Sequence, residues 1–343
     1  MNNITLKRLA KELNLATSTV SRSLRDSHEI SQETKDRVKA LAAKLDFQPN
    51  PHASSLRKNK SKTIAVIVPE IQNNFFAQVM NGVEEVAQQK GYHILIYLTH
   101  ENFQRESEIL HLLKNGRVEG VMISVSNTTN SFDHLKAYQE ANIPLVFFDR
   151  VYDEINVPSI TTDDTEAAFR ATKHLIESGC ERIAFFSMSN SLSISGRRKA
   201  GYMNALKKYG MEDTAITVEG SPDDEANRQK IRELLQSDQR PDGIFAAIEK
   251  FAVNAYEVCR ELELKIPRDV QVISFSNLSA TALFDPPLST VVQPAYNIGR
   301  ESADILCRII DNKKIFAAEK KIVLPSELVI RGSTKPKLKK KER

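Results

Sequence analysis

The sequence predicts a small all-α head that contains a helix-turn-helix, followed by an α/β core of two doubly wound parallel-sheet subdomains. Two observations carry this prediction. Apolar residues recur with helical spacing in the first 47 residues, and strand and helix patterns alternate from Thr63 onward. A length of 343 residues also exceeds that of a single ordinary core, so two or three domains are expected.

The head is predicted to form three short helices. The apolar residues of the first helix follow an i, i+3, i+4, i+7 pattern: Leu6, Leu9, Ala10 and Leu13. Thr5 stands before them as a candidate N-cap. A three-residue connection, 14–16, leads to a second helix at about Thr17–Leu24, and a third starts near Ser31. This arrangement is the plan of a helix-turn-helix.

The core is predicted from buried-strand runs that alternate with amphipathic helical stretches. The expected strands are Thr63–Val68, His93–Leu98, Gly120–Val125, Pro144–Asp149, Arg182–Ser187, Ile216–Glu219, Gly243–Ile248 and Val270–Phe275. Such alternation indicates parallel sheets with helices on both faces. The longer stretch near Val151–Asp164 divides the strands into two sets, which predicts two subdomains with a cleft at the carboxyl ends of their strands.

The charge of the chain is unevenly distributed. Residues 1–62 carry thirteen Lys and Arg against six Asp and Glu, a net charge of +7, and residues 335–343 carry +5. The stretch 63–334 is therefore −8, within a total of +4. A basic head on an acidic body indicates a module that binds a polyanion, joined to a domain with a separate task.

Several classes of protein are disfavoured by the sequence. No run of eighteen apolar residues and no apolar leader occur, so neither a membrane span nor secretion is expected. The three cysteines form no CxxC pair, which disfavours a zinc site and a disulfide framework and favours the cytoplasm. Motifs of common enzymes and cofactor sites are missing, so we expect no enzyme activity, no cofactor and no metal.

The start of the second helix carries the side chains suited to reading DNA. In a helix-turn-helix this end enters the major groove, and the residues concerned are Thr17, Ser18, Thr19, Ser21 and Arg22. Small hydroxyl groups can bond bases or phosphates at close approach, and Arg22 can bond a guanine in bidentate fashion. An ordinary surface helix with Ser and Thr near its N-cap would show the same residues. These residues alone therefore do not decide between a DNA-reading helix and a surface helix.

Longer motifs resolve this choice. The segment Ile4–Leu24, ITLKRLAKELNLATSTVSRSL, resembles the DNA-binding head of the lactose/galactose repressor family of bacterial transcription regulators. The resemblance continues in order through essentially the whole chain except its tail, at 30–38, 47–57, 67–76, 148–150, 174–185, 198–202 and 287–291. It implies a regulator, expected to be a repressor, that binds a palindromic operator as a homodimer.

The resemblance also implies how the protein holds DNA. Residues outside the second helix are placed among the DNA contacts as well: Thr5, Leu6, Asn50, Ala53 and Leu56. The linker 48–62 would form a hinge helix when two subunits meet on the operator. Leu56 would then wedge into the minor groove and kink the DNA. A stray surface leucine is the alternative interpretation of Leu56.

The larger part of the chain resembles periplasmic sugar-binding proteins, which close on ligands by hinge motion. This resemblance puts Phe75 and Phe76 at the mouth of the cleft, Asp149 and Arg150 at a strand end, and Arg198 at the start of a helix facing them. An aromatic ring with a fixed Asp and Arg suits a polyhydroxylated ring. Taken singly, the Phe residues could be core, Asp149 a turn cap and Arg198 a surface residue.

Two positions depart from the family pattern. Many relatives carry Asn-Asp where this chain has Ile248-Glu249, and Asp where it has Ser276. We expect Glu249 and Ser276 to line the cleft, with a changed hydrogen-bonding geometry. A simple hexose or pentose is therefore not assured as the effector, and an oligosaccharide, a sugar phosphate, a nucleoside or a weak or absent ligand stays open.

Two alternative functions remain. One is a regulator of the catabolite-control type, which responds to a protein corepressor, and the other, disfavoured, is a sugar-processing or sugar-binding enzyme-like protein. No heptad tail follows the core, so tetramerisation through a C-terminal coiled coil is not expected. An effector linkage of ~1–3 kcal/mol would change operator affinity roughly 5- to 150-fold.

The domain boundaries follow from these patterns. The helix-turn-helix head spans 1–47, the linker 48–62, the core 63–334 and a basic, disordered tail 335–343. Within the core we assign about 63–160 and 292–324 to an N-subdomain, and about 161–291 and 325–334 to a C-subdomain.

Overall fold

The structure is a computed structural model that describes residues 5–47, 61–114, 116–127, 131–188, 193–313 and 319–336. It divides into two compact units, Met1–Ser61 and Lys62–Arg343, which we call the head and the core and describe separately. In the described ranges, no helix is long and apolar enough to cross a membrane.

The head contains the three predicted helices: α1 (Leu6–Leu13), α2 (Thr17–Leu24) and α3 (Gln32–Lys44). The Thr5 side chain accepts a hydrogen bond from the Arg8 amide at 3.4 Å, so the predicted N-cap of α1 is confirmed. Asn14 ends α1 in the left-handed conformation, with φ of 51°, which lets the chain turn sharply into α2. Leu9, Val20 and Val38 are fully buried between the helices.

The N-subdomain is a parallel six-stranded sheet of order β11-β5-β4-β3-β1-β2. Its strands are β1 (Thr63–Val68), β2 (His93–Leu98), β3 (Gly120–Ile123), β4 (Leu145–Phe148), β5 (Ser159–Thr162) and β11 (Lys321–Leu324). Helices α5 (Asn74–Gln89) and α12 (Ala295–Ile310) cover one face, and α6 (Phe103–Leu113) and α7 (Asp133–Glu140) the other. The alternating side chains of β1 serve both faces, since Val66 packs under α5 and α12 and Ile67 under α6 and α7.

The C-subdomain repeats this plan in a sheet of order β12-β10-β9-β8-β6-β7, with only the β10–β12 pair antiparallel. Its strands are β6 (Ile183–Ser187), β7 (Ile216–Glu219), β8 (Gly243–Ala246), β9 (Gln271–Phe275), β10 (Ser289–Val292) and β12 (Glu327–Val329). Helices α8 (Asp164–Glu177) and α9 (Ser193–Lys208) cover one face, and α10 (Asp224–Gln236) and α11 (Glu249–Glu261) the other. Short 3-10 helices are η1 (Glu212–Thr214) and η2 (Ser279–Leu283).

The predicted fold class is confirmed, but the sheets are larger than the sequence indicated. All eight predicted strands are present, and β5, β10, β11 and β12 join them. The stretch 151–164, predicted as a connection, contains β5 and the first residue of α8. The sequence of β5, Ser-Ile-Thr-Thr, is too short and polar to read as a buried strand.

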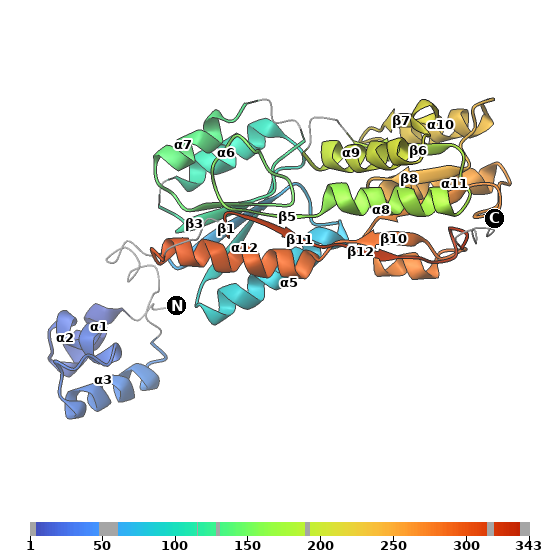
Figure 1. Cartoon of the computed structure of the whole chain (residues 1–343). Helices are drawn as coiled ribbons and strands as arrows, with labels where there is room; N and C mark the ends of the chain where they lie inside the picture. Colours follow the sequence, from blue (N-terminus) through green and yellow to red (C-terminus); the bar gives the residue numbers. More distant parts are fainter. Residues whose placement is uncertain are drawn as a thin grey trace. The chain divides into compact units, whose positions relative to one another are not determined.

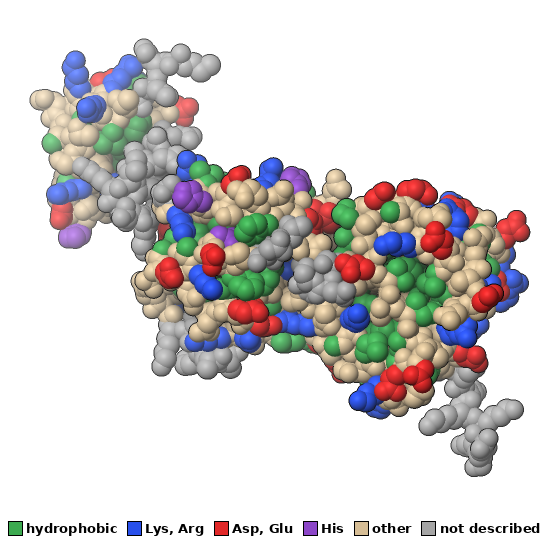
Figure 2. Space-filling view, turned by 90° about the horizontal axis from the view of Figure 1, so that it is seen from above, with side chains coloured by type: hydrophobic (Ala, Val, Ile, Leu, Met, Phe, Trp, Pro, Cys, Tyr) green, Lys and Arg blue, Asp and Glu red, His purple; other side chains and the backbone are tan. Residues whose placement is uncertain are grey.

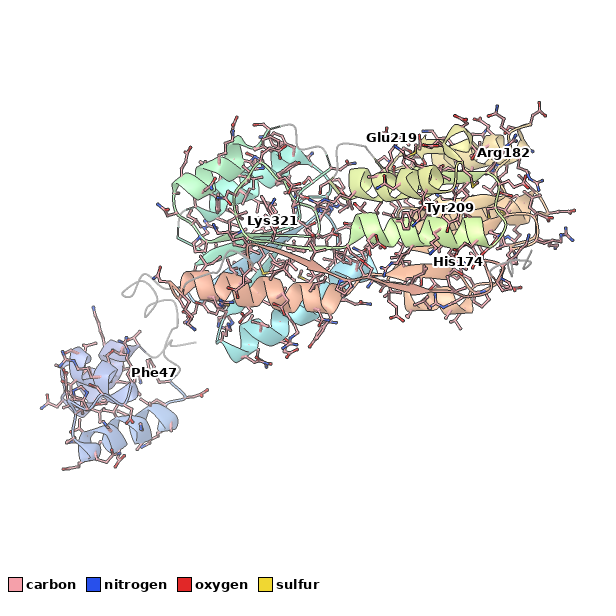
Figure 3. All side chains as sticks on the ribbon, in the orientation of Figure 1. Phe47, His174, Arg182, Tyr209, Glu219 and Lys321 are labelled. Atoms are coloured by element: carbon pink, nitrogen blue, oxygen red, sulfur yellow. The ribbon has the colours of Figure 1, made fainter. Side chains whose placement is uncertain are left out.

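The chain crosses between the subdomains three times: after β5, after β10 and after β11. Figure 3 labels Lys321, at the start of β11 in the N-subdomain, and His174 and Arg182 in the C-subdomain. Each subdomain is therefore built from separate segments of the sequence, and three connections join the two sheets.

Each subdomain holds a pair of helices in backbone contact. Figure 1 shows α5 and α12 side by side along one face of the N-subdomain. A Cβ added at Gly82 would lie 2.1 Å from the carbonyl oxygen of Tyr296, and one at Gly299 would lie 2.1 Å from that of Val79. On α9, a Cβ added at Gly201 would lie 2.2 Å from the carbonyl oxygen of Thr165 on α8. Glycine is required at these positions because no side chain fits between the helices.

Candidate functional site: the head surface and the core cleft

The start of α2 presents hydroxyl groups on the surface of the head. Thr17 and Ser18 are exposed, and Thr19 and Ser21 are half-buried. Ala16 is the N-cap of α2, and this position makes no side-chain capping bond. The hydroxyl groups at this end are therefore not explained as helix caps.

Arg22 lies on the same helix and is more than half exposed. Its Nη1 is 2.7 Å from the Glu29 carboxylate, which is also about half exposed. An exposed pair of this kind stabilises by ~0–1 kcal/mol, so Arg22 can exchange Glu29 for another partner at little cost. Of the other predicted contacts in the head, Thr5 is exposed and Leu6 packs partly against its core. Asn50, Ala53 and Leu56 lie outside the described residues.

The core contains a cleft at the carboxyl ends of its strands, where both subdomains contribute side chains. It is lined by Asn73, Phe75, Phe76, Asp149, Arg150, Ile194, Arg198, Ile248, Glu249, Phe275, Ser276, Asn277 and Gln293. All seven residues assigned to the cleft from the sequence are brought together here. The free volume is about 40 Å³. Since small-molecule sites usually measure ~300–1,000 Å³, a ligand must separate the walls to enter.

The aromatic wall comes from the first turn of α5. The Asn73 side chain caps this helix by accepting a hydrogen bond from the Phe75 amide at 2.8 Å. Phe75 and Phe76 meet edge to face at 5.2 Å between ring centroids, and both are almost fully buried. They therefore belong to the core of the N-subdomain and line the cleft at the same time.

Asp149 and Arg150 follow β4 directly. Asp149 has a φ of 60°, a left-handed conformation that non-glycine residues adopt rarely and that clusters at functional sites. The Ser124 hydroxyl donates to its carboxylate at 3.4 Å. Arg150 instead turns to Glu101, whose two carboxylate oxygens accept from its Nη1 at 2.7 and 2.9 Å.

Burial raises the pKa of the Asp149 carboxyl from 3.8 to about 6, and Arg150 and Arg198 offset part of this effect. The folded protein thus binds this proton more tightly than the unfolded chain. The stabilising contribution of protonated Asp149 is complete below the unfolded pKa and is lost as the pH rises through about 6.

We expect Asp149→Asn to flatten the fall in melting temperature between about pH 4 and about pH 7, because the variant carries no titrating carboxyl there. Melting curves of both proteins across this range measure the effect. Asp133→Asn, which changes an exposed carboxylate on α7, is the matched control and should keep the dependence of the parent. Equal slopes for Asp149→Asn and the parent protein would contradict the role given to Asp149.

Arg198 differs from the sequence-based expectation in its place on the helix. It lies in the second turn of α9, which begins at Ser193, and does not open the helix. Its side chain is buried, with Nε 2.7 Å from Oδ1 of Asp164 and Nη1 donating to the Ala247 carbonyl at 2.6 Å. The guanidinium also lies over the Phe275 ring at 3.8 Å. A surface role for Arg198 is thereby excluded, whereas its neighbour Arg197 is partly exposed.

The two positions that depart from the family pattern contact each other. The Ser276 hydroxyl, just after β9, donates to Oε2 of Glu249 at 2.6 Å. Glu249 is the first residue of α11, so its carboxylate also faces the positive end of that helix. Ser276 in turn accepts from the Leu278 amide at 3.1 Å. The Glu249 carboxylate therefore lies at the N-terminus of α11, and the hydrogen bond from Ser276 positions it.

Sequence reasoning missed the residues that join the subdomains across the cleft. Asn277 Nδ2 donates to the Gln78 side chain at 3.0 Å and to the Gln293 carbonyl at 2.8 Å. The Gln78 side-chain amide donates a hydrogen bond to the Asn277 carbonyl at 3.3 Å. Asp164, the partner of Arg198, was also missed. Their nearness in sequence to predicted cleft residues could have indicated Gln78 and Asn277, because Gln78 follows Phe76 by two residues and Asn277 follows Ser276 directly.

The cleft offers the means to bind a polar ring. It combines aromatic surface, carboxylates and two arginines in a nearly closed space, which suits orientation of a ligand by hydrogen bonds. In the described part of the chain, no group of His, Cys, Asp or Glu side chains is arranged to hold a metal ion. A larger groove of about 600 Å³ lies at the end of α11, but none of the charged groups above converge on it.

The comparisons with known proteins agree with this division. Residues 5–50 match the family model of bacterial regulatory proteins of the lacI family, and residues 61–329 match the model of periplasmic binding proteins and the sugar binding domain of the LacI family. The chain is 32% identical over 333 residues to the HTH-type transcriptional repressor CytR of Escherichia coli K12, covering 96% of each. It is 31% identical over 332 residues to the ribose operon repressor of Halalkalibacterium halodurans, covering 96% of this chain and 97% of that relative. Among solved structures, the lac repressor dimer bound to operator and the anti-inducer ONPF shares the fold, with a TM-score of 0.85 over 97% of this chain and 99% of that one at 24% identity.

Proposed function

Since this chain belongs to the LacI family of bacterial regulatory proteins, we propose that it represses transcription as a homodimer on a palindromic operator, under the control of a sugar-like effector bound in the core cleft. The observation that carries the effector part of the proposal is the convergence of Phe75, Asp149, Arg198 and Glu249 in one nearly closed cleft. We place the protein in the bacterial cytoplasm, because the operator DNA lies there.

DNA recognition is assigned to the start of α2. The exposed hydroxyl groups of Thr17 and Ser18 and the weakly held Arg22 support this assignment, because they can reach base edges and phosphates. The linker, with Asn50, Ala53 and Leu56, is assigned to the minor groove on the basis of its sequence alone.

A homodimer is supported by apolar side chains on the surface of the core. Leu95 and Ile96 are exposed on β2, an edge strand, and Ile71 is exposed after β1. In the C-subdomain, Leu283 is 87% exposed next to Phe284, which packs on Tyr256. Figure 2 shows hydrophobic side chains reaching the surface of the core between charged ones. Contact with a second copy would bury such groups and cover the edge strand.

Effector control is assigned to rotation of the subdomains. The bonds of Asn277 to Gln78 and to the Gln293 carbonyl join the two walls, and the ligand would act on the same walls. A ligand that binds one arrangement of the subdomains more tightly shifts the population toward it. The three connections between the sheets confine the motion to a hinge.

We expect Arg22→Ala to reduce affinity for an operator selected from random DNA by ~1–3 kcal/mol, about 5- to 150-fold, because a bidentate base contact is lost. Affinity for unrelated DNA should fall much less. Competition binding of the full-length protein measures both quantities.

The control for Arg22 is Arg37→Ala, which removes the same charge from an exposed position on α3. It should weaken binding to both DNAs to a similar, smaller extent. A parent protein that selects no sequence from random DNA would refute the proposed function, and equal losses on both DNAs for Arg22→Ala would remove Arg22 from base recognition.

A further inference from the structure

The two arginines of the cleft are already neutralised by protein carboxylates. Arg150 is paired with both oxygens of Glu101, and Arg198 with Asp164 and the Ala247 carbonyl. An incoming anion would have to displace Glu101 or Asp164 from its arginine, or accept a hydrogen bond without a free positive charge behind it. Arg150 Nε is buried without a hydrogen-bond partner, but it lies 3.9 Å from the Asp149 carboxylate, so neither arginine offers an uncompensated positive charge to a phosphate.

Two further carboxylates face the cleft without a hydrogen bond from an arginine. Asp149 lies beside the Arg150 side chain, but its Oδ2 is 3.9 Å from Arg150 Nε, beyond hydrogen-bond distance. Glu249 accepts one bond, from Ser276 to Oε2. Its other oxygen makes no hydrogen bond with the residues that the structure describes, and Glu249 has no cationic partner among them. Among the described groups at the cleft, those that lack a hydrogen-bond partner are thus mainly acceptors, and Arg150 Nε is a donor that departs from this pattern.

This arrangement selects by charge. Carboxylates in a nearly closed space repel a phosphate or carboxylate ligand strongly, because the surrounding medium screens poorly. They favour a ligand that brings hydroxyl donors, and the rings of Phe75 and Phe76 offer apolar surface to one face of such a ligand.

We propose that the cleft binds an uncharged polyhydroxylated compound and excludes phosphate esters, with Glu249, positioned by Ser276, as the residue that determines this specificity. The inference rests on the proposed function and narrows its effector to one class. It removes the sugar phosphates left open by the sequence. Ser276 carries no charge itself, and the carboxylate of Glu249 reaches it from the neighbouring helix start.

The test is calorimetric titration of the full-length protein with matched pairs: D-ribose and D-ribose 5-phosphate, D-glucose and D-glucose 6-phosphate, and uridine and uridine 5′-monophosphate. We expect binding by at least one uncharged member and at least about tenfold weaker binding by its phosphate. Glu249→Gln should weaken the uncharged ligand about tenfold or more, since a charged acceptor is lost, and should narrow the gap between the pair.

Two variants complete the design. Glu249→Asp keeps the charge but is one methylene too short to keep the Ser276 bond, and it should also weaken binding. Glu261→Gln, at the exposed end of the same helix, is the matched control and should leave binding unchanged. Melting curves of each variant establish that the core is folded during titration.

The outcomes separate the inference from the proposed function. Equal or tighter binding by a phosphate ester overturns the inference. An uncharged ligand whose affinity is unchanged in both Glu249 variants overturns it as well. A panel in which no uncharged member binds also overturns it. Operator selection by the ligand-free protein is measured independently. None of these results therefore decides the DNA-binding part of the proposed function, which only the operator-selection assay tests.

Discussion

Replacing Arg198 with Ala is expected to lower the free energy of unfolding of the core by about 3–5 kcal/mol and to abolish any response to effector. The first effect follows because the change leaves Asp164 buried without its cation, and a buried charge that loses its partner is strongly destabilising. The second follows because Arg198 lines the cleft. Thermal or denaturant unfolding measures the first, and an operator-binding titration with the effector measures the second.

Two companion variants isolate these effects. Arg197→Ala removes the adjacent, partly exposed arginine and its Asp153 pair, and should cost no more than ~1 kcal/mol. The double change Asp164→Leu with Arg198→Met replaces the buried pair by apolar groups and should recover most of the stability without recovering the effector response. If Arg197→Ala and Arg198→Ala destabilise the protein equally, the buried pair does not have the importance given to it.

The second large effect is expected for Gly299→Ala, which we predict to destabilise the protein by about 3 kcal/mol. The new methyl group would lie 2.1 Å from the Val79 carbonyl oxygen, so α12 and α5 must separate by more than side-chain adjustment allows. Their separation would disturb the packing of Ile298 and Val83, which are fully buried in the N-subdomain. Denaturant unfolding of the full-length protein measures the change.

Gly196→Ala is the matched control, because it makes the same substitution in the first turn of α9, where no atom of the described residues lies within 4 Å of the new methyl group. It should stabilise the protein by ~0.5–1 kcal/mol, since alanine loses less backbone entropy in a helix than glycine. The two variants are therefore expected to differ in sign. A neutral Gly299→Ala would mean that the helices can move apart freely.

The fold could be predicted from the sequence wherever one segment carried a clear pattern. Runs such as Thr63–Val68 are buried on both faces and read as strands without reference to the rest of the chain. The sequences of β5 and β12 did not indicate strands, because each has only three or four residues and is stabilised as a strand by pairing with its neighbours in the sheet. Glycines in backbone contact, such as Gly299, were equally unreadable, since the partner helix lies more than two hundred residues away.

The site could be predicted as a set of residues but not as a set of contacts. The resemblance named Arg198 and Asp149, and the structure brings them to one cleft. It did not indicate that Arg198 is held by Asp164, because that carboxylate lies in a stretch read as a connection. The pairing of Glu249 with Ser276 was also beyond the sequence, which presented the two departures as separate losses.

The three crossings between the subdomains also determine when the protein becomes complete during its synthesis. The last helix of the head ends at Lys44, so the head can fold early, while the rest of the chain is still being synthesised. The N-subdomain, by contrast, lacks α12 and its edge strand β11 until residue 324, and the C-subdomain lacks β12 until residue 329. Both halves of the cleft thus mature together at the end of translation, so a prematurely terminated chain would retain a head without a sensor.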